Sequence, residues 1–484
     1  MKRILFGFAS CLLFASLGLL ATRASATAPR TYWQQHVAYS IAVTVIDSIH
    51  TLDGTLGVTY TNNSPDTLRV VYFHLYYNAF QPGSMMDVRS RVIQSRPVVD
   101  RIANMTPSET GRYDIRNGLT DNGKEVKWEV QGTILKVYLN EPILPGATTN
   151  LSMVYREQIP LLTRRGGWSS PDGVAYSMSQ WYPKVAEYDA EGWQIQEYIA
   201  REFYGVWGEY QVAITLPSRF TVGASGTCTN PAEVGHGYER IATGARDGVA
   251  APEPMKTGMT TWHFYANNVH DFAWVADDDY VHQWQTWQDT ITIHSLFRRN
   301  VAGLWRNSLE YTLHALKTYT ELYGPYVYRD FSTTEAGDGG MEYPQLIMIT
   351  GRRGTLSLAG VIAHEVGHQW FYGMLGNNES REAFMDEGFT SYVTSKATER
   401  LFGRNQIVPG IERSWMDWFL PKFDNHSDNY RGYQSYAVTG YEEPLVIPHD
   451  WFREDIGAGQ VYGKTQAILS MLEYVLGDSV FARG

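Results

Sequence analysis

The chain has little cysteine, no run of basic residues and, beyond its first 26 residues, no long apolar stretch. Its two cysteines are Cys11 and Cys228, and Cys11 lies in that first segment, so the remaining chain can form no intrachain disulfide. Its 40 Lys and Arg face 51 Asp and Glu, and the formal net charge is −11. Such a chain lacks the basic surface of a nucleic-acid binder, and we expect no nucleic acid as a partner.

The composition is that of a folded protein, with 44% hydrophobic and 19% charged residues over 484 positions. We expect two or three domains at this length. The first 26 residues resemble a secretory signal, because Lys2 and Arg3 precede an apolar run and Ala24-Ser25-Ala26 offers a cleavage site. Residues 1–26 are therefore predicted to be a signal peptide, and the protein to be exported to the periplasm or the medium. No later stretch is apolar for long enough to span a membrane.

Short stretches of alternating apolar and polar residues fill the first half of the chain, from Tyr39 to about Asp278. Clear examples are Ile41, Val43 and Val45, followed by Val71, Phe73, Leu75 and Tyr77. This alternation is typical of half-buried strands, and further strands are expected at 212–216 and 260–265. The Gly- and Ala-rich segment 242–251 is expected to be a surface loop. Residues 27–280 are predicted to form a β-rich N-terminal domain.

Helical spacing begins after Tyr280, where Leu309, Leu313 and Leu316 recur on one helix face before Gly324-Pro325. Residues 331–348 carry β-type residues around a Gly-rich turn. Further helices are expected at about 358–374, 383–401 and 462–476. Residues 281–484 are therefore predicted to form a mixed α/β domain.

The expected helix at 358–374 contains His364-Glu365-Val366-Gly367-His368, an H-E-x-x-H pattern. Residues four apart share a helix face, so both imidazoles can bind one metal ion with Glu365 beside it. Catalytic zinc sites have three protein ligands and one open position, and the third ligand is commonly a carboxylate. Glu387, separated from His368 by eighteen residues, is the candidate third ligand. The alternatives are two ordinary histidines and an acidic residue near a helix N-terminus.

These residues and their spacing resemble the aminopeptidase N type of gluzincin metallopeptidases, to which the leukotriene hydrolase and bacterial relatives belong. The segments 368–371 and 387–389 are also similar to the family's sequence around its ligands. The resemblance implies a multi-domain protein, with an all-β saddle-like N-terminal domain followed by a mixed α/β thermolysin-like zinc metallopeptidase domain. It implies one Zn²⁺ per chain, held by His364, His368 and Glu387. Family members continue into a helical domain, which we expect to be absent or truncated in a sequence that stops at Gly484.

Gly339-Gly340-Met341-Glu342-Tyr343 resembles the family's G-x-M-E-N exopeptidase motif, with Tyr343 in place of Asn. The resemblance implies that Gly339, Gly340 and Met341 line the substrate site and that Glu342 binds the free α-amine. A buried ammonium needs such a carboxylate partner. A solvated strand residue is the alternative for Glu342. Gln180, in Ser179-Gln180-Trp181-Tyr182, is loosely similar to a second amine-site residue that the family's β domain supplies.

Val461-Tyr462-Gly463-Lys464 resembles the family's Y-x-K-G segment, with Thr465 in place of Gly. The resemblance implies that the Tyr462 phenol stabilises the tetrahedral intermediate, since a neutral phenol can donate to an oxyanion. A tyrosine buried in the core is the alternative.

Together these residues predict a zinc aminopeptidase that releases N-terminal amino acids from peptides with a free N-terminus, with Glu365 as the general base for a zinc-activated water. An endopeptidase or an epoxide hydrolase on the same scaffold stays open, as does a non-catalytic binding module. Glu342 disfavours the endopeptidase, because its charge requires a free amine. Glu365 disfavours the binding module, because a structural zinc site needs no base. The oligomeric state and the preferred N-terminal residue stay unknown.

Overall fold

The structure is a computed structural model that describes residues 32–92, 100–116, 118–199, 201–337, 339–403, 425–451 and 459–483. The predicted signal peptide, residues 1–26, lies outside these ranges and stays a prediction. Every helix within them is too short or too polar to cross a lipid bilayer.

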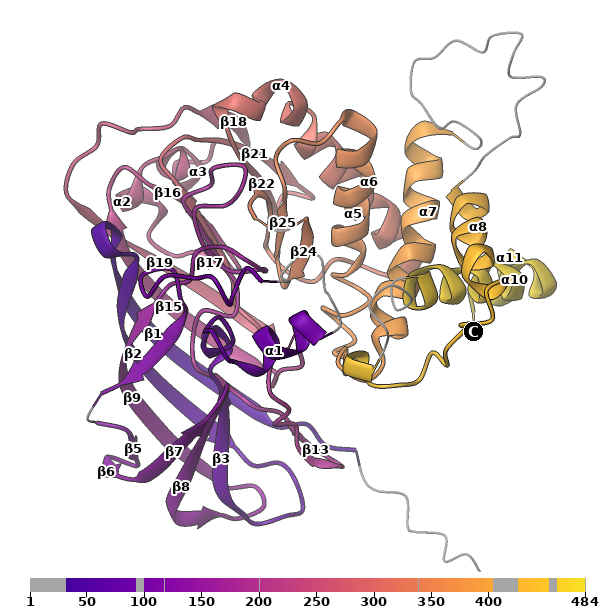
Figure 1. Ribbon diagram of the computed structural model, residues 1–484. Helices are drawn as coiled ribbons and strands as arrows, with labels where there is room; N and C mark the ends of the chain where they lie inside the picture. Colours follow the sequence, from indigo (N-terminus) through magenta and orange to yellow (C-terminus); the bar gives the residue numbers. More distant parts are fainter. Residues whose placement is uncertain are drawn as a thin grey trace, which may run out of the picture.

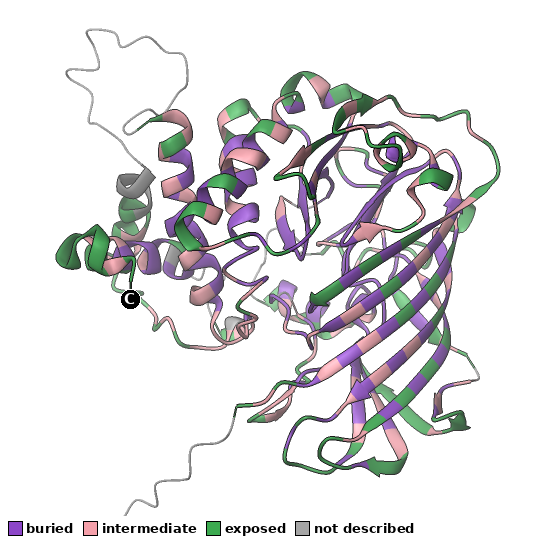
Figure 2. Ribbon diagram, turned by 180° about the vertical axis from the view of Figure 1, so that it is seen from behind, coloured by how far each residue is buried: buried purple, intermediate pink, exposed green. Residues whose placement is uncertain are grey.

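A large twisted sheet dominates the N-terminal half (Figure 1). Its strands alternate as the sequence predicts: in β1 the side chains of Ile41 and Val43 are buried, whereas those of Ser40 and Thr44 are exposed. The same striping runs along the neighbouring strands in Figure 2. The order across the sheet is β17 (Thr227–Cys228), β19 (Met259–Val269), β15 (Gly208–Pro217), β1 (His36–Ile46), β2 (Thr51–Thr61), β9 (Thr148–Gln158), β5 (Thr120–Asp121) and β6 (Lys124–Glu125), and β4 (Arg112–Ile115) also pairs with β9.

Smaller sheets complete this half, which is mostly β as predicted. One sheet has the order β12 (Lys184–Val185), β3 (Leu68–His74), β8 (Ile134–Ile143) and β7 (Lys127–Gln131). Another has the order β10 (Gly167–Trp168), β11 (Tyr176–Met178), β20 (Trp274–Asp277) and β16 (Thr221–Ala224). A short hairpin joins β13 (Tyr188–Asp189) to β14 (Gly192–Trp193).

The first half departs from the all-β prediction at short helical segments and at one strand. The helical segments are α1 (Met85–Val92), α2 (Pro231–Val234), α3 (Tyr238–Ala242) and the 3-10 turns η1 (Asp47–Ile49) and η2 (Tyr76–Ala79). Tyr77, expected in a strand, lies in η2, where its ring stays buried. The expected loop at 242–251 contains β18 (Asp247–Ala250), because the edge of β21 offers this segment a backbone partner that its own sequence does not reveal.

The second half is built on a mixed sheet, whose order is β18, β21 (Tyr280–Trp287), β22 (Ile291–Arg298), β23 (Asp330–Glu335), β25 (Leu346–Ile349) and β24 (Gly340–Tyr343). β22, β23 and β25 run parallel, and β24 closes the edge antiparallel to β25. β18 precedes residue 280 in the sequence but joins this sheet, and the domain boundary at 280 stays a prediction. Apolar side chains of both halves form a continuous core.

Helices cover this sheet on the side where α5, α6 and α7 stand next to one another (Figure 1). Their bounds, with those of the other segments, are η3 (Arg299–Val301), α4 (Ala302–Trp305), α5 (Ser308–Tyr323), α6 (Thr355–Gly367), η4 (Phe384–Gly388), α7 (Phe389–Phe402), α8 (Asn425–Ala437), η6 (His449–Trp451), η7 (Gly459–Lys464), α10 (Thr465–Leu476) and α11 (Asp478–Phe481). The predicted C-terminal ends of α5, α7 and α10 are confirmed within two residues, and each is followed by a glycine with positive φ. The last two helices begin later than predicted, at Phe389 and Thr465, because a π-helical turn precedes each of them.

The helix expected at 358–374 is α6, and it ends earlier than predicted, at Gly367. The following residues form successive turns, and the backbone of Tyr372 has a φ of 139°, which no helix accommodates. The indole of Trp370 turns inward and donates to the carbonyl of Gly324 at 3.1 Å. Packing of this aromatic segment against α5 thus ends the helix despite its helical spacing.

Candidate active site

The three predicted metal ligands converge on one point. Nε2 of His364 lies 3.1 Å from Oε2 of Glu387, Nε2 of His368 lies 3.4 Å from the same oxygen, and the two imidazole nitrogens are 3.2 Å apart. A tetrahedral zinc ion with ligands at about 2.0 to 2.1 Å separates its ligand atoms by about 3.3 to 3.4 Å. The three atoms therefore match one face of a zinc coordination tetrahedron, and two nitrogens with one carboxylate oxygen are the donor set of a catalytic zinc site.

Glu387 and Tyr462 both lie on π-helical turns, η4 and η7, which directly precede α7 and α10. Such turns are rare and re-aim side chains where a regular helix would not place them. The hydroxyl of Tyr462 donates to Oε1 of Glu387, and its ring stacks on His364 with centroids 5.9 Å apart. A Cβ at Gly388 would lie 2.3 Å from Cβ of Thr465, so this glycine permits η4 to pack against the first residue of α10. The predicted tyrosine thus reaches the ligand set.

Two residues that the sequence analysis did not assign hold the far side of the imidazoles. Oδ1 of Asp386, a fully buried side chain, lies 2.6 Å from Nδ1 of His368. Oγ1 of Thr394 lies 3.3 Å from Nδ1 of His364. A carboxylate behind a ligating histidine fixes the orientation of the ring and makes it a better ligand. Asp386 directly precedes Glu387 in sequence, so the adjacency of two acids was the available signal.

Replacing Asp386 by Asn should weaken zinc binding by about 10- to 100-fold, because the amide keeps the shape but loses the charge that supports His368. Zinc affinity measured by competition with a chelator checks this expectation. Asp189→Asn, a change in the distant β13 hairpin, is the control and should leave zinc affinity unchanged. Equal zinc affinity in Asp386→Asn and wild type would reduce Asp386 to a packing residue.

Glu365, the predicted general base, is 5% exposed and stands on α6 facing β24. One of its oxygens lies in a group with Glu342 and His368 whose potential ligand atoms are all within 4.8 Å of one another. Burial raises the pKa of the Glu365 carboxyl, and His364 and His368 oppose that rise. A base with a raised pKa accepts a proton more readily at neutral pH. The position of Glu365 next to the metal ligands and the raised pKa of its carboxyl both suit a residue that transfers protons.

Gly340 keeps space for this base. A Cβ at Gly340 would lie 2.1 Å from Oε1 of Glu365. This oxygen is at the end of a flexible side chain, and it would have to move to make room. Gly340→Ala should therefore keep zinc content and folding while lowering turnover by roughly 100-fold, because a misplaced base loses its alignment. Gly303→Ala is the matched control, since nothing lies near a Cβ there. Unchanged turnover in Gly340→Ala would show that the base tolerates displacement.

Glu342 lies on the edge strand β24, where it is opposite Ile347 of β25 and only 3% exposed. Its Oε1 is buried and has no hydrogen-bond partner among the described residues. Burial, followed by nearby carboxylates including Asp386, raises the pKa of Glu342 well above its ordinary value, while His368 lowers it. The solvated-strand alternative for Glu342 is therefore wrong, because the side chain is buried beside the metal ligands.

The hairpin that carries Glu342 is bound to the segment just after α6 by Gln369, another residue that the sequence analysis left without a role. Its side chain is fully buried, accepts from the Gln345 amide at 2.8 Å and donates to the Tyr343 carbonyl at 3.0 Å. Both backbone groups flank the turn after β24. Gln369 thus fixes the distance between Glu342 and the two histidines.

Gln180 is less directly placed. Its amide nitrogen donates to Oδ2 of Asp271 at 2.7 Å and to the Tyr343 hydroxyl at 3.4 Å. Within the described ranges no hydrogen bond joins Gln180 to Glu342. Gln180 reaches only the residue next to Glu342, and its part in the amine site stays a prediction. Gly339 and Met341 flank Gly340, the glycine that faces Glu365; Gly339 lies just before β24 and Met341 within it.

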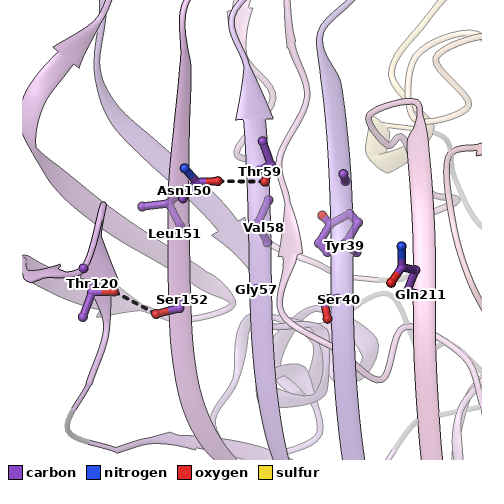
Figure 3. Close-up of a pocket in the computed structure, with 12 residues that line it drawn as sticks. Tyr39, Ser40, Gly57, Val58, Thr59, Thr120, Asn150, Leu151, Ser152 and Gln211 are labelled. Atoms are coloured by element: carbon purple, nitrogen blue, oxygen red, sulfur yellow. Dashed lines mark hydrogen bonds between the residues drawn. The ribbon is translucent and has the colours of Figure 1, made fainter.

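A separate hollow of about 370 Å³ lies on the outer face of the large sheet (Figure 3). Small polar side chains line it, and hydrogen bonds join Thr59 to Asn150 and Thr120 to Ser152. Its lining contains none of the predicted site residues. This hollow is therefore separate from the candidate metal site.

Comparisons with known proteins agree with this geometry. Residues 331–484 match the Peptidase family M1 domain. Mouse aminopeptidase B is 31% identical over 169 residues, which cover 34% of this chain and 25% of that protein. Leukotriene A-4 hydrolase of Xenopus laevis is 40% identical over 95 residues, which cover 18% of this chain and 15% of that protein. The match therefore spans at most a quarter of either relative.

A solved structure covers more of the chain. The M1 zinc metallopeptidase from Deinococcus radiodurans has a TM-score of 0.60 and 17% sequence identity, over 93% of this chain and 84% of that chain. At this identity the similarity establishes the fold, a β-rich N-terminal half followed by a metallopeptidase domain. The resemblance found in the sequence, to the aminopeptidase N type of gluzincin metallopeptidases, is confirmed by the family M1 domain at residues 331–484 and by these relatives.

Proposed function

We propose that this chain is a zinc-dependent aminopeptidase that cleaves the first peptide bond of peptides with a free N-terminus. The observation that carries the proposal is Glu342, a buried carboxylate with a raised pKa that lies within reach of both the ligand set and Glu365. A buried carboxylate without a partner costs free energy unless a cation meets it. The α-ammonium of a peptide is a cation of the right size.

His364, His368 and Glu387 would hold the metal. When bound there, the metal would polarise the peptide carbonyl and lower the pKa of a coordinated water. Glu365 accepts a proton from the attacking water and later delivers it to the departing amine. The Tyr462 hydroxyl donates to the oxygen on which negative charge develops. The hydrogen bond to Glu387 places the Tyr462 hydroxyl next to the three ligands. Burial and the charge of Glu387 raise the pKa of Tyr462, so the phenol stays protonated.

Glu342 sets the cleavage position in this scheme. Gln369, two residues after the end of α6, holds the end of β24 next to that helix, and this contact limits how far the ammonium site can move from the base. A peptide whose ammonium meets Glu342 presents its first carbonyl at the ligand set, and an internal bond would leave Glu342 unneutralised. This favours an aminopeptidase over an endopeptidase.

Purified protein should contain about one zinc per chain, because the three ligands form one tetrahedral face. His364→Ala should lose most of that zinc, whereas His263→Ala, a change of an exposed histidine on β19, should keep it. Metal analysis of chelator-free protein measures both. Removal of the metal should abolish hydrolysis of aminoacyl chromogenic substrates, and added Zn²⁺ should restore it. Full zinc occupancy in His364→Ala would contradict the ligand assignment.

A further inference from the structure

The hairpin of β13 and β14 borders a cavity of about 490 Å³, which is distinct from the hollow on the large sheet. The start of the described chain, from Tyr32, and residues of the loop 376–382 form its other walls. Trp33 stacks on Tyr188 of the hairpin with ring centroids 5.9 Å apart, so the chain start and the hairpin lie side by side (Figure 1). The lining contains none of the metal ligands or predicted substrate residues, so a molecule in this cavity would occupy a separate site.

The walls of this cavity carry an excess of negative charge. Four acids line it, namely Glu187, Asp189, Glu191 and Glu382. Arg381 is the only Lys or Arg among the described residues that line the cavity, and its guanidinium contacts Oε2 of Glu191. The positive charge of Arg381 is therefore taken up by one acid, and the other three form no ion pair within the described ranges.

Glu187 is the most buried of the four acids, at 7% exposed. Its Oε1 accepts from the amide of Tyr188 at 3.2 Å, whereas its Oε2 has no hydrogen-bond partner in the part of the chain that the structure describes. Burial, followed by the charge of Glu187, raises the pKa of Tyr204, another residue of the lining, so the Glu187 carboxyl lies close to that phenol. Glu187 thus offers an unused acceptor at the wall of the cavity.

The nearest cation does not neutralise Glu187. Burial raises the pKa of Glu187 to about 8, the charge of Asp189 adds to the rise, and the Tyr188 amide and Lys184 oppose it. Lys184 is already paired, since its Nζ lies 2.8 Å from Oδ2 of Asp271 and its side chain is 2% exposed. A carboxyl with a raised pKa lacks a cation at contact distance. A cation that enters the cavity would supply that partner.

We propose that the cavity binds a guanidinium group, with Glu187 as its carboxylate partner and aromatic rings of the wall against its faces. The rings that line the cavity are those of Trp33, Tyr188, Tyr204 and Trp207. A guanidinium is planar, stacks on aromatic faces and has five N–H donors, so it needs several acceptors. Acceptors besides Glu187 are present, because the side-chain oxygens of Asn377 and Asn378 in the lining are buried and have no partner among the described residues.

The inference is independent of the proposed hydrolysis, because the cavity and the three metal ligands share no residue. Two sources can supply the guanidinium. One is a separate molecule, such as a peptide that contains arginine. The other is Arg30 of the same chain, which stands two positions before Tyr32 in the sequence. The rival explanation is that Glu187 is a neutral, buried acid and that the cavity binds no cation.

The experiment titrates ethylguanidinium and ethylurea by calorimetry into the zinc-loaded full chain. The two compounds are similar in size and shape, but only the first is charged. One equivalent of ethylguanidinium should bind to wild type or, where Arg30 already fills the cavity, to Arg30→Gln alone. Ethylurea should bind at least tenfold more weakly, since it makes no charge-assisted hydrogen bond. Tetramethylammonium, which has no N–H group, should also bind more weakly than ethylguanidinium.

Two substitutions locate the binding site, each made in the protein that binds ethylguanidinium. Glu187→Gln should weaken binding of ethylguanidinium by at least tenfold, because the amide carries no charge. Glu342→Gln is the control, because it removes another buried carboxylate that belongs to the proposed amine site. Its affinity for ethylguanidinium should equal that of its parent protein.

Absence of ethylguanidinium binding in both wild type and Arg30→Gln would overturn the proposal in favour of a neutral Glu187. Equal affinity for ethylguanidinium and ethylurea would overturn it as well, and this comparison needs no substitution at Glu187. Tetramethylammonium bound as tightly as ethylguanidinium would exclude recognition of the N–H groups. Unchanged affinity in Glu187→Gln, with a loss in Glu342→Gln, would place the bound cation at the amine site and remove the cavity from the account.

Discussion

Glu365→Gln is expected to lower turnover by about 10²- to 10⁴-fold, the range typical for loss of a general base. The amide keeps the size of the side chain and removes its proton acceptor. Because Glu365 is not among the three proposed ligands, zinc content should match wild type. Burial raises the pKa of the Glu365 carboxyl, so a neutral side chain here should not lower the unfolding temperature. Steady-state kinetics, metal analysis and thermal unfolding of the same preparation test these expectations.

Two outcomes would contradict this role. Turnover close to that of wild type in Glu365→Gln, with zinc present, would require another base. Loss of zinc in the variant would make Glu365 part of the metal site. The fall in turnover would then reflect the missing metal and would not support a role as general base. Glu157→Gln serves as the control, because Glu157 is a buried glutamate of β9 that belongs to none of the groups of possible metal ligands in the described residues.

Glu342→Gln is expected to raise the Michaelis constant for free-amine substrates by roughly tenfold to a hundredfold, since a charge-assisted contact to the ammonium is lost. Turnover should fall as well, because a misplaced amine moves the first carbonyl away from the base. The free energy of unfolding should not decrease, because the substitution removes the need to bury a carboxylate charge whose Oε1 has no partner in the described residues. Kinetics and denaturant unfolding measure the two effects separately.

The kinetic loss must be specific to substrates with an amine. The variant could instead hydrolyse an N-acetylated substrate as fast as the same substrate with a free amine. That result would show that Glu342 excludes capped substrates and does not anchor the amine. A Michaelis constant equal to that of wild type, together with a lower free energy of unfolding, would make Glu342 a structural residue.

The ligand set could be predicted from sequence because its information is local. His364 and His368 share a helix face by spacing alone, and Glu387 follows at a characteristic distance. The direction in which Glu387 and Tyr462 point could not be predicted this way, since both depend on π-helical turns. A one-residue expansion of a helix leaves no mark in the apolar periodicity.

Residues whose role depends on tertiary contacts were also missed, because their own sequence segments do not show which groups the fold brings next to them. Gln369 was noted only as a neighbour of the histidines, and its role follows from backbone groups after β24 that the fold brings to it. The strand β18 was expected to be a loop, because its partner β21 is supplied by the fold.

The central claim is hydrolysis from a free N-terminus, and one measurement tests it most directly. A single peptide and its N-acetylated form are incubated with the zinc-loaded enzyme, and the products are identified by mass spectrometry over time. The account predicts stepwise release of N-terminal residues from the free peptide, no cleavage of the acetylated one, and no products from either after zinc is removed. Internal cleavage of the acetylated peptide at a comparable rate would contradict it.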